Sequence, residues 1–339
     1  MGDTRKSFAK VNYHNQDFLS LRGQITLLTP EGWSVLNYFK KEKKNIMTER
    51  KVVFLFLIPS LVFLIVFYYY PVYSAVKYSF FKWDGVNERF IGLYNFSRMV
   101  RDEWFIRSLG NIVILTLIRL MLSLTAPLLG AVLISRVQNP RVRYFYRVAF
   151  VIPMVVAFIV LVLMWQFMYE YRIGLINQFF KAVGLDRLIH NWLGEDGTAL
   201  YAIAFLGFPW ITSFNFGLYF LIYSAGLDNI PATMHDAAMI DGANSLERFL
   251  HIDLPMLRGQ IKIVVILLII NSIQYFVPVL IMTKGGPGTA TMLPGLVMFY
   301  NGFKFGNMGY ASAIGFTLFS AILVLSWINI KYLKSGVQI

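Results

Sequence analysis

The chain has 339 residues, of which 57% are hydrophobic and 14% are charged, and its mean hydropathy is +0.58. A soluble domain carries about 25% charged residues, so this composition excludes an ordinary soluble protein. The formal net charge is +13, but the basic residues are scattered between apolar blocks, which argues against nucleic-acid binding.

The first part of the chain, residues 1–48, is too polar to cross a membrane and contains no apolar core of a signal peptide. Thr29–Glu31 predicts a helix start with proline at the first helical position. Trp33, Leu36 and Phe39 would then form an apolar stripe. Two interpretations of this cytoplasmic extension stay open: an interfacial helix on the inner leaflet, or a short helix packed on its own protein.

Long apolar blocks dominate the rest of the chain. A membrane-crossing helix needs roughly 20 apolar residues, and its backbone groups must be satisfied internally. The second block has one charged residue, Arg119, and the others have none. The blocks cover residues 52–70, 109–135, 148–169, 199–227, 263–283 and 308–330. The sequence therefore predicts an all-α membrane protein with six core transmembrane helices.

The loops between the blocks differ in charge. Basic residues gather at 40–51 and 136–147 and return after the last block, whereas the loop at 170–198 is mixed and that at 284–307 is poor in charge. Because cytoplasmic loops carry the excess of lysine and arginine, we expect both termini in the cytoplasm and a multi-pass location in a bacterial-type cytoplasmic (inner) membrane.

The sequence lacks the groups that catalysis or ion coupling would need. It has no cysteine, no phosphate-binding loop motif, and no Asp, Glu or His in the six blocks. We therefore predict no catalytic residue, metal site or cofactor in this chain. Transport energised by a separate subunit fits best; an ion-coupled secondary transporter and a membrane scaffold protein are the alternatives.

The polar segment between the fourth and fifth blocks, residues 228–258, has a distinctive pattern. Ala237 and Ala238 have minimal side chains, so another surface can approach their backbone closely. Gly242 permits a break between two short helices, and Pro255 favours a new start for the next span. The pattern predicts a pair of short helices built to contact another protein.

This segment resembles the EAA loop of permease subunits in binding-protein-dependent ABC importers. The matching positions keep the family's spacing, with an Asp in place of the usual Glu. They are Asp236, Ala237, Ala238, Gly242, Ile252, Leu254 and Pro255. A second stretch, residues 283–288 with Gly-Gly-Pro, is similar to the signature of the carbohydrate branch of these permeases.

The resemblance implies a type I ABC importer permease over residues 49–339. It implies a second permease, the same or different, two ATP-binding subunits that hold ATP and Mg, and an extracytoplasmic binding protein that delivers a carbohydrate. The chain itself would not be an enzyme. The residues that would couple to the ATPase subunit are Asp236, Ala237, Ala238, Ile240, Gly242 and Phe249.

Arg119 is the charged residue within the blocks. It lies about 15 Å into its span at 1.5 Å per residue, where a charge costs at least ~2.5 kcal/mol. One interpretation is that it faces the pathway and contacts an anionic or hydroxyl-rich substrate. The alternative is that it pairs with helix carbonyls or with an acid of a partner subunit.

Polar side chains recur at helical spacing in the fifth block. Asn271, Gln274 and Tyr275 can share one face, which must meet a cavity or another helix because polar groups facing lipid are costly. Amides and aromatic rings suit sugars, so these residues are candidates for the substrate pathway. Hydrogen bonds between helices are the alternative. Asn215 and Trp165 are weaker candidates of the same kind.

Overall fold

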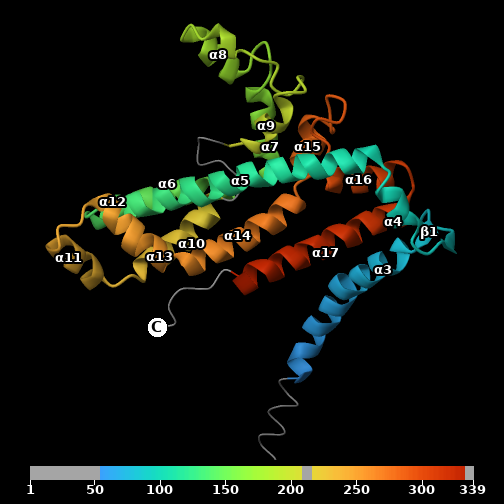
Figure 1. The fold of residues 1–339 in the computed structure, drawn as a ribbon, viewed down its shortest axis with the longest axis horizontal. Helices are drawn as coiled ribbons and strands as arrows, with labels where there is room; N and C mark the ends of the chain where they lie inside the picture. The colour runs from blue at the N-terminus through green and yellow to red at the C-terminus, as the bar shows by residue number, and fades with distance from the viewer. Residues whose placement is uncertain (1–53, 208–215, 333–339) are drawn as a thin grey trace, which may run out of the picture. The chain divides into compact units, whose positions relative to one another are not determined.

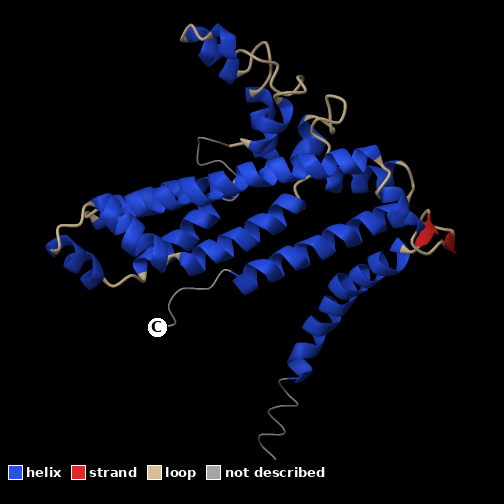
Figure 2. Ribbon diagram, viewed as in Figure 1, coloured by secondary structure: helices blue, strands red, loops and turns tan. Residues whose placement is uncertain are grey.

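A computed structural model describes residues 54–207 and 216–332. Within these ranges the regular structure is helical apart from one two-stranded sheet (Figure 2). The chain divides into two compact units, Met1–Val72 and Tyr73–Ile339. The N-terminal extension predicted for residues 1–48 lies outside the described residues, as does Asn215.

The described part of the first unit is one apolar helix. It begins at Phe54, includes the π-helical turn η1 (Ile65–Tyr69) and continues into α3 (Tyr70–Ser79). The whole helix has 26 residues, or about 39 Å at 1.5 Å per residue, more than the roughly 30 Å of hydrocarbon in a bilayer. Its side chains from Phe54 to Val72 are all exposed, so this apolar surface must meet lipid or another protein.

Three further long apolar helices lie in the second unit. They are α5 (Glu103–Ser135), the pair formed by α14 (Arg258–Ile273) and α15 (Val277–Met282), and α17 (Met308–Tyr332). With Phe54–Ser79 they make 4 helices in the described residues that are long and apolar enough to cross a membrane. They correspond to the first, second, fifth and sixth predicted blocks.

The third predicted block is not a straight helix. α6 (Pro140–Val151) leads through the short helix η2 (Ile152–Val155) into α7 (Phe158–Met168), and the two longer segments are bent by 90°. Pro153 has no N–H to donate, and Val156 adopts an extended conformation with ψ of 132°. The helical ladder is therefore interrupted between α6 and α7.

The fourth predicted block is described only in part. α9 (Ala199–Ala204) precedes residues 208–215, which lie outside the described ranges, and α10 (Phe216–Asp228) follows them. The described residues thus carry 4 spanning helices, or up to 5 if the bent pair is one span, where the sequence predicts six. The all-α membrane architecture is confirmed, while the count of six stays a prediction.

A small hairpin follows α3. Strands β1 (Phe81–Trp83) and β2 (Glu88–Phe90) pair in antiparallel fashion, with Lys82 opposite Arg89. The Asp84 carboxylate accepts the backbone N–H groups of Val86 at 2.9 Å and Asn87 at 2.7 Å. The Asn87 side-chain amide, which donates to the same carboxylate at 3.1 Å, and these two backbone bonds stabilise the charged form and lower the pKa of Asp84 to about 2.

The hairpin is fixed to the rest of the unit by α4 (Tyr94–Met99) and α17. The buried Asn95 side chain donates to the carbonyl oxygens of Ser79 and Phe81, both at 2.9 Å. Gly309 in α17 lies against the Phe81 carbonyl so closely that a Cβ atom at this position would overlap it. The hairpin therefore depends on a glycine more than two hundred residues further along the chain.

Shorter helices fill the two remaining loops. Residues 170–198 contain α8 (Leu175–Ala182) and η3 (Asp186–Leu188), and α16 (Pro294–Phe299) with the π-helical η5 (Tyr300–Lys304) precedes α17. In the first of these loops the buried Asn177 amide donates to Tyr171 O and His190 O and accepts from Trp192 Nε1. This one side chain satisfies groups from three points of the loop.

The long helices of the second unit pack on one another. α5 lies against α10 and α14, and α14 lies against α17 (Figure 1). Their buried residues form two clusters. The first cluster includes Leu115, Val162, Trp165, Tyr275 and Leu296, and the second includes Leu128, Phe220, Tyr223, Leu257 and Val264. Both clusters use α5, which makes this helix the common element of the core.

Candidate functional site

The segment between α10 and α14 folds into short helices, as the sequence predicts. α11 (Ala232–Ile240) follows Pro231, and α12 (Ser245–Arg248), the π-helical η4 (Phe249–Asp253) and α13 (Leu254–Met256) follow Gly242. Gly242 has a φ of +79°, which L side chains rarely adopt. The break predicted at this glycine is therefore confirmed.

The second half of the segment starts with a strong helix signal. The Asn244 side chain accepts the N–H groups of Leu246 at 2.9 Å and Glu247 at 3.0 Å, while Glu247 accepts the Asn244 N–H at 2.7 Å. This reciprocal capping box provides acceptors for backbone N–H groups that have no partner within the first turn of a helix. The cap at Asn244 lies two residues after Gly242. The change of direction between α11 and α12 is therefore fixed by the positive φ of Gly242 at the end of α11 and by the capping box at the start of α12.

The predicted coupling residues differ in exposure. Ile240 is 87% exposed, Asp236 and Ala237 are also exposed, and Ala238 is half-buried. Phe249, however, packs partly against the second core cluster, so it anchors the segment to the helical core and is not part of its outward surface. The sequence pattern missed other exposed apolar side chains of this segment, which are Met234, Met239, Leu246 and Leu250.

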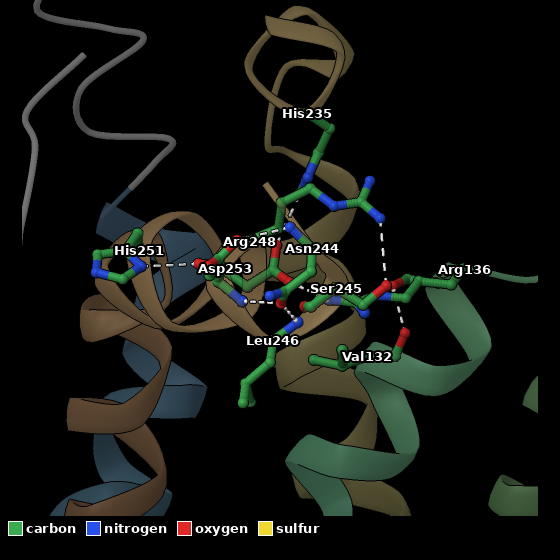
Figure 3. A network of polar contacts seen from close by, with 11 residues as sticks. Val132, Arg136, His235, Asn244, Ser245, Leu246, Arg248, His251 and Asp253 are labelled. Carbon is green, nitrogen blue, oxygen red and sulfur yellow. Dashed lines mark hydrogen bonds and ion pairs between the residues drawn. The ribbon is translucent and has the colours of Figure 1, made fainter. Parts of the chain in front are cut away.

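A polar network joins this segment to the end of α5 (Figure 3). Arg136, directly after α5, lies 3.3 Å from the Asp253 carboxylate through Nη2, and the same atom donates to the Ser245 carbonyl at 3.0 Å. His235 Nε2 lies 3.4 Å from the other Asp253 oxygen. Neither Arg136 nor Asp253 was singled out as functional in the sequence, because their pairing depends on how the chain folds.

A second candidate site lies around Arg119 in α5. Its guanidinium carbon lies 3.7 Å from the centre of the Tyr275 ring, a cation–π contact. Its Nη1 atom is shielded from solvent and has no hydrogen-bond partner among the described residues. The structure thus brings together two residues that the sequence placed on separate helices as candidates for the substrate pathway.

Other candidates from the sequence take different places. Trp165 is buried in the first core cluster, and its Nε1 has no hydrogen-bond partner within the described ranges. Asn271 donates to the Leu267 carbonyl of its own helix at 2.7 Å. Gln274 is exposed at the end of α14. The polar face predicted for the fifth block is therefore interrupted where α14 ends, and Asn271 is satisfied locally.

The Gly-Gly-Pro stretch forms a compact loop beside the start of α5. Asn111 Nδ2 donates to the carbonyls of Thr289 at 3.1 Å and Met292 at 2.9 Å, and the hydroxyls of Thr283 and Thr291 lie 2.7 Å apart. An open cleft of about 440 Å³ adjoins the loop. It is lined by Glu103, Trp104, Arg107, Asp196, Pro287, Gly288 and Thr289.

The described residues contain no group of three or more His, Cys, Asp or Glu side chains able to hold a metal ion. The structure combines three features. They are a body of long apolar helices, a buried contact between Arg119 and Tyr275, and a segment of short helices, α11 and α12, with exposed apolar side chains. These features are those of a polytopic helical membrane protein with a segment suited to docking on another protein.

Comparison with known families agrees with this class. Residues 124–331 match the family described as "Binding-protein-dependent transport system inner membrane component". This range is more than half of the chain and includes α10, α11 and α14. The chain belongs to this family, and it is accordingly a permease subunit of an ATP-binding-cassette importer.

Individual relatives match almost the whole permease. The probable ABC transporter permease protein YurN of Bacillus subtilis is 31% identical, over 86% of this chain and 99% of its own length. The multiple sugar-binding transport system permease protein MsmF of Streptococcus mutans is 30% identical, over 85% of this chain and 99% of its own. A crystal structure of a bacterial alginate ABC transporter, in complex with alginate pentasaccharide-bound periplasmic protein, contains a similar fold. The matched chain has a TM-score of 0.72, at 18% identity, over 86% of this chain and 99% of that chain.

Proposed function

We propose that this permease translocates a carbohydrate, an oligosaccharide or sugar derivative, that an extracytoplasmic binding protein delivers. It pairs with a second permease and with two ATP-hydrolysing subunits, which bind ATP and Mg. The observation that carries the proposal is the family match, whose range includes a two-helix segment with the predicted glycine break. A relative named for multiple sugars and a neighbour that transports alginate support the carbohydrate class.

The proposed substrate pathway contains Arg119, Tyr275 and Trp165. Aromatic rings suit the C–H faces of sugars, and a guanidinium can bind hydroxyl or carboxylate oxygens in pairs. Arg119 Nη1 and Trp165 Nε1, which have no hydrogen-bond partner in the described part of the chain, are two donors for such groups. Asn271, Gln274 and Asn215 belong to the same proposal, but Asn271 already has a partner in its own helix.

The proposed contact with the ATPase subunit is the outward surface of α11, with Asp236, Ala237, Ala238 and Ile240. Apolar surface removed from water contributes about 25 cal/mol per Å², so an isolated Ile240 at the surface favours a partner protein. Small side chains at Ala237 and Ala238 allow close approach, and the Asp236 carboxylate can form a charge-assisted bond to that partner. Gly242 sets the angle of α11, and Phe249 supports it.

The proposal includes a topology. Residues 1–48 form a cytoplasmic extension, residues 49–339 form the importer domain, and both termini and the segment 228–258 lie in the cytoplasm. The charge difference between the loops supports this orientation. α8, the hairpin and the Gly-Gly-Pro loop then lie outside, where a binding protein docks.

The test uses the complex with its ATPase and binding-protein partners in proteoliposomes. ATP hydrolysis is measured with a panel of maltotriose, diacetylchitobiose and alginate pentasaccharide, together with entry of each sugar. We expect one class to stimulate hydrolysis and to accumulate inside. Ala238→Asp should keep the chain in the membrane but remove the ATPase partner or its coupling. Ala182→Asp, which adds the same charge at the exposed end of α8, is the matched control outside this loop. Sugar entry that follows an ion gradient without ATP would overturn the proposal.

A further inference from the structure

Asp253 is a buried acid whose two carboxylate oxygens have different partners. Its side chain is 4% exposed. Oδ2 lies 3.3 Å from Arg136 Nη2, and Oδ1 lies 3.4 Å from His235 Nε2. A carboxylate shielded from water is costly unless it is paired, so the ion pair with Arg136 stabilises the buried Asp253 and leaves its other oxygen to face His235.

The partners of Asp253 come from different parts of the chain (Figure 3). Arg136 directly follows α5, His235 lies in α11, and Asp253 is the last residue of η4, which leads through α13 into α14. Arg136 also donates to the carbonyl of Ser245, the first residue of α12. Asp253 and Arg136 therefore join the end of α5 to α11, α12 and η4.

Few contacts with other described helices hold α11 in position. None of the other described helices packs extensively against it, and the break at Gly242 separates it from α12. Among the described residues, the contact between His235 and Asp253 is a side-chain link that relates the position of α11 to that of Arg136.

We propose that Asp253 is a positioning residue that transmits movement of α11 to α5. This inference rests on the proposed function, in which the ATPase subunit moves α11. Along the chain, α11 is connected to α14 and to α10 but not to α5. The contacts of Asp253 with His235 and Arg136 add the direct route to α5.

The route through α5 leads to Arg119 and Tyr275, the proposed substrate-pathway residues. Arg119 precedes Arg136, the C-cap residue of α5, by 17 residues (136 − 119), and the helix between them continues through Pro127. The distance is about 25 Å at 1.5 Å per residue. A displacement of the Arg136 end therefore moves the backbone that carries Arg119. Tyr275 lies two residues beyond the end of α14. The route from α11 along the chain through α14 and the route through Asp253 and α5 therefore meet where Arg119 and Tyr275 are in contact.

The absence of cysteine from the sequence allows a clean reporter on α5. Met121, which is 70% exposed, is replaced by Cys and labelled with bimane in the complete complex in nanodiscs. Fluorescence is recorded without nucleotide and with ATP and vanadate. Asp253→Asn should keep the ATPase subunit bound but reduce the nucleotide-dependent change by about fivefold or more. Asp228→Asn, which removes the separate ion pair with Arg147, is the matched control and should leave the change intact.

A second variant keeps the test decisive if Asp253→Asn does not fold. His235→Ala alters a surface helix and leaves the pair of Arg136 and Asp253 in place, and it should also reduce the bimane response. A full response in His235→Ala, with the ATPase subunit bound, would overturn the inference and leave the proposed function standing. If the unaltered chain failed to bind the ATPase subunit, the proposed function and the inference would fall together.

Discussion

The left-handed backbone at Gly242 allows a sharp test of how α11 is presented to its partner. A residue with a Cβ atom costs roughly 1–2 kcal/mol in this conformation, and Gly242 has a φ of +79°. Apart from Gly242 and its two chain neighbours, no atom of the described chain lies within 4 Å of the Cβ position, so the cost comes from the backbone and not from a clash. Gly242→Ala should therefore reduce the population with α11 correctly oriented by roughly 5- to 30-fold, and the apparent affinity for the ATPase subunit by the same factor.

A series at this position separates strain from size. Asn tolerates the left-handed region better than Ala does although it is larger. If strain decides, Gly242→Asn binds the ATPase subunit more tightly than Gly242→Ala. If the partner's backbone approaches closely, the order reverses because the larger side chain collides. Affinity is measured by biolayer interferometry on permease in nanodiscs, with ATP hydrolysis recorded on the same samples.

The control is a glycine with the same backbone requirement elsewhere. Gly306 has a φ of +68° and likewise no atom near its Cβ position, and it lies in the loop before α17. Gly306→Ala carries the same strain but should leave affinity for the ATPase subunit unchanged. Wild-type affinity in Gly242→Ala would refute the reasoning, since the positive φ would then have no consequence for docking.

Three further predictions concern other parts of the chain. Cysteines placed at Asp186 and Ala290 in this cysteine-free chain should react with an impermeant thiol reagent from outside the cell, and reaction only from the cytoplasm would contradict the topology. Arg119→Ala should abolish sugar-stimulated ATP hydrolysis, while Arg119→Lys, which keeps the charge, should retain part of it; unchanged stimulation in both would remove Arg119 from the pathway. Gly309→Ala should lower the melting temperature markedly, because the new Cβ overlaps the Phe81 carbonyl; Gly110→Ala, with open space around it, should not.

Local patterns were sufficient for much of this molecule. Apolar blocks of spanning length predict helices because a backbone in lipid has no other way to satisfy its polar groups, and four of the predicted blocks are long helices in the described residues. The glycine at 242 predicts a break between helices, because a residue without a Cβ is suited to positive φ, and the structure has that φ. Both signals depend only on neighbouring residues.

Local sequence patterns did not predict the bend between α6 and α7. Hydropathy alone makes the block at 148–169 one span, whereas the structure turns by 90° around Pro153 and Val156. Proline within an apolar block is compatible with a kink, a break or a continuous helix. Packing of α6 against α10 and α5, and of α7 against α15, decided among these outcomes.

The sequence by itself determined which segments are helical and apolar, and which loop has the form of a docking segment. Only the tertiary structure decided which side chains meet. Arg119 lies over Tyr275 because α5 packs on α14, and Arg136 reaches Asp253 across 117 positions of chain. Hydropathy and turn signals arise within a few residues, but contacts of this kind arise from the angle and register at which whole helices pack, which no local pattern encodes.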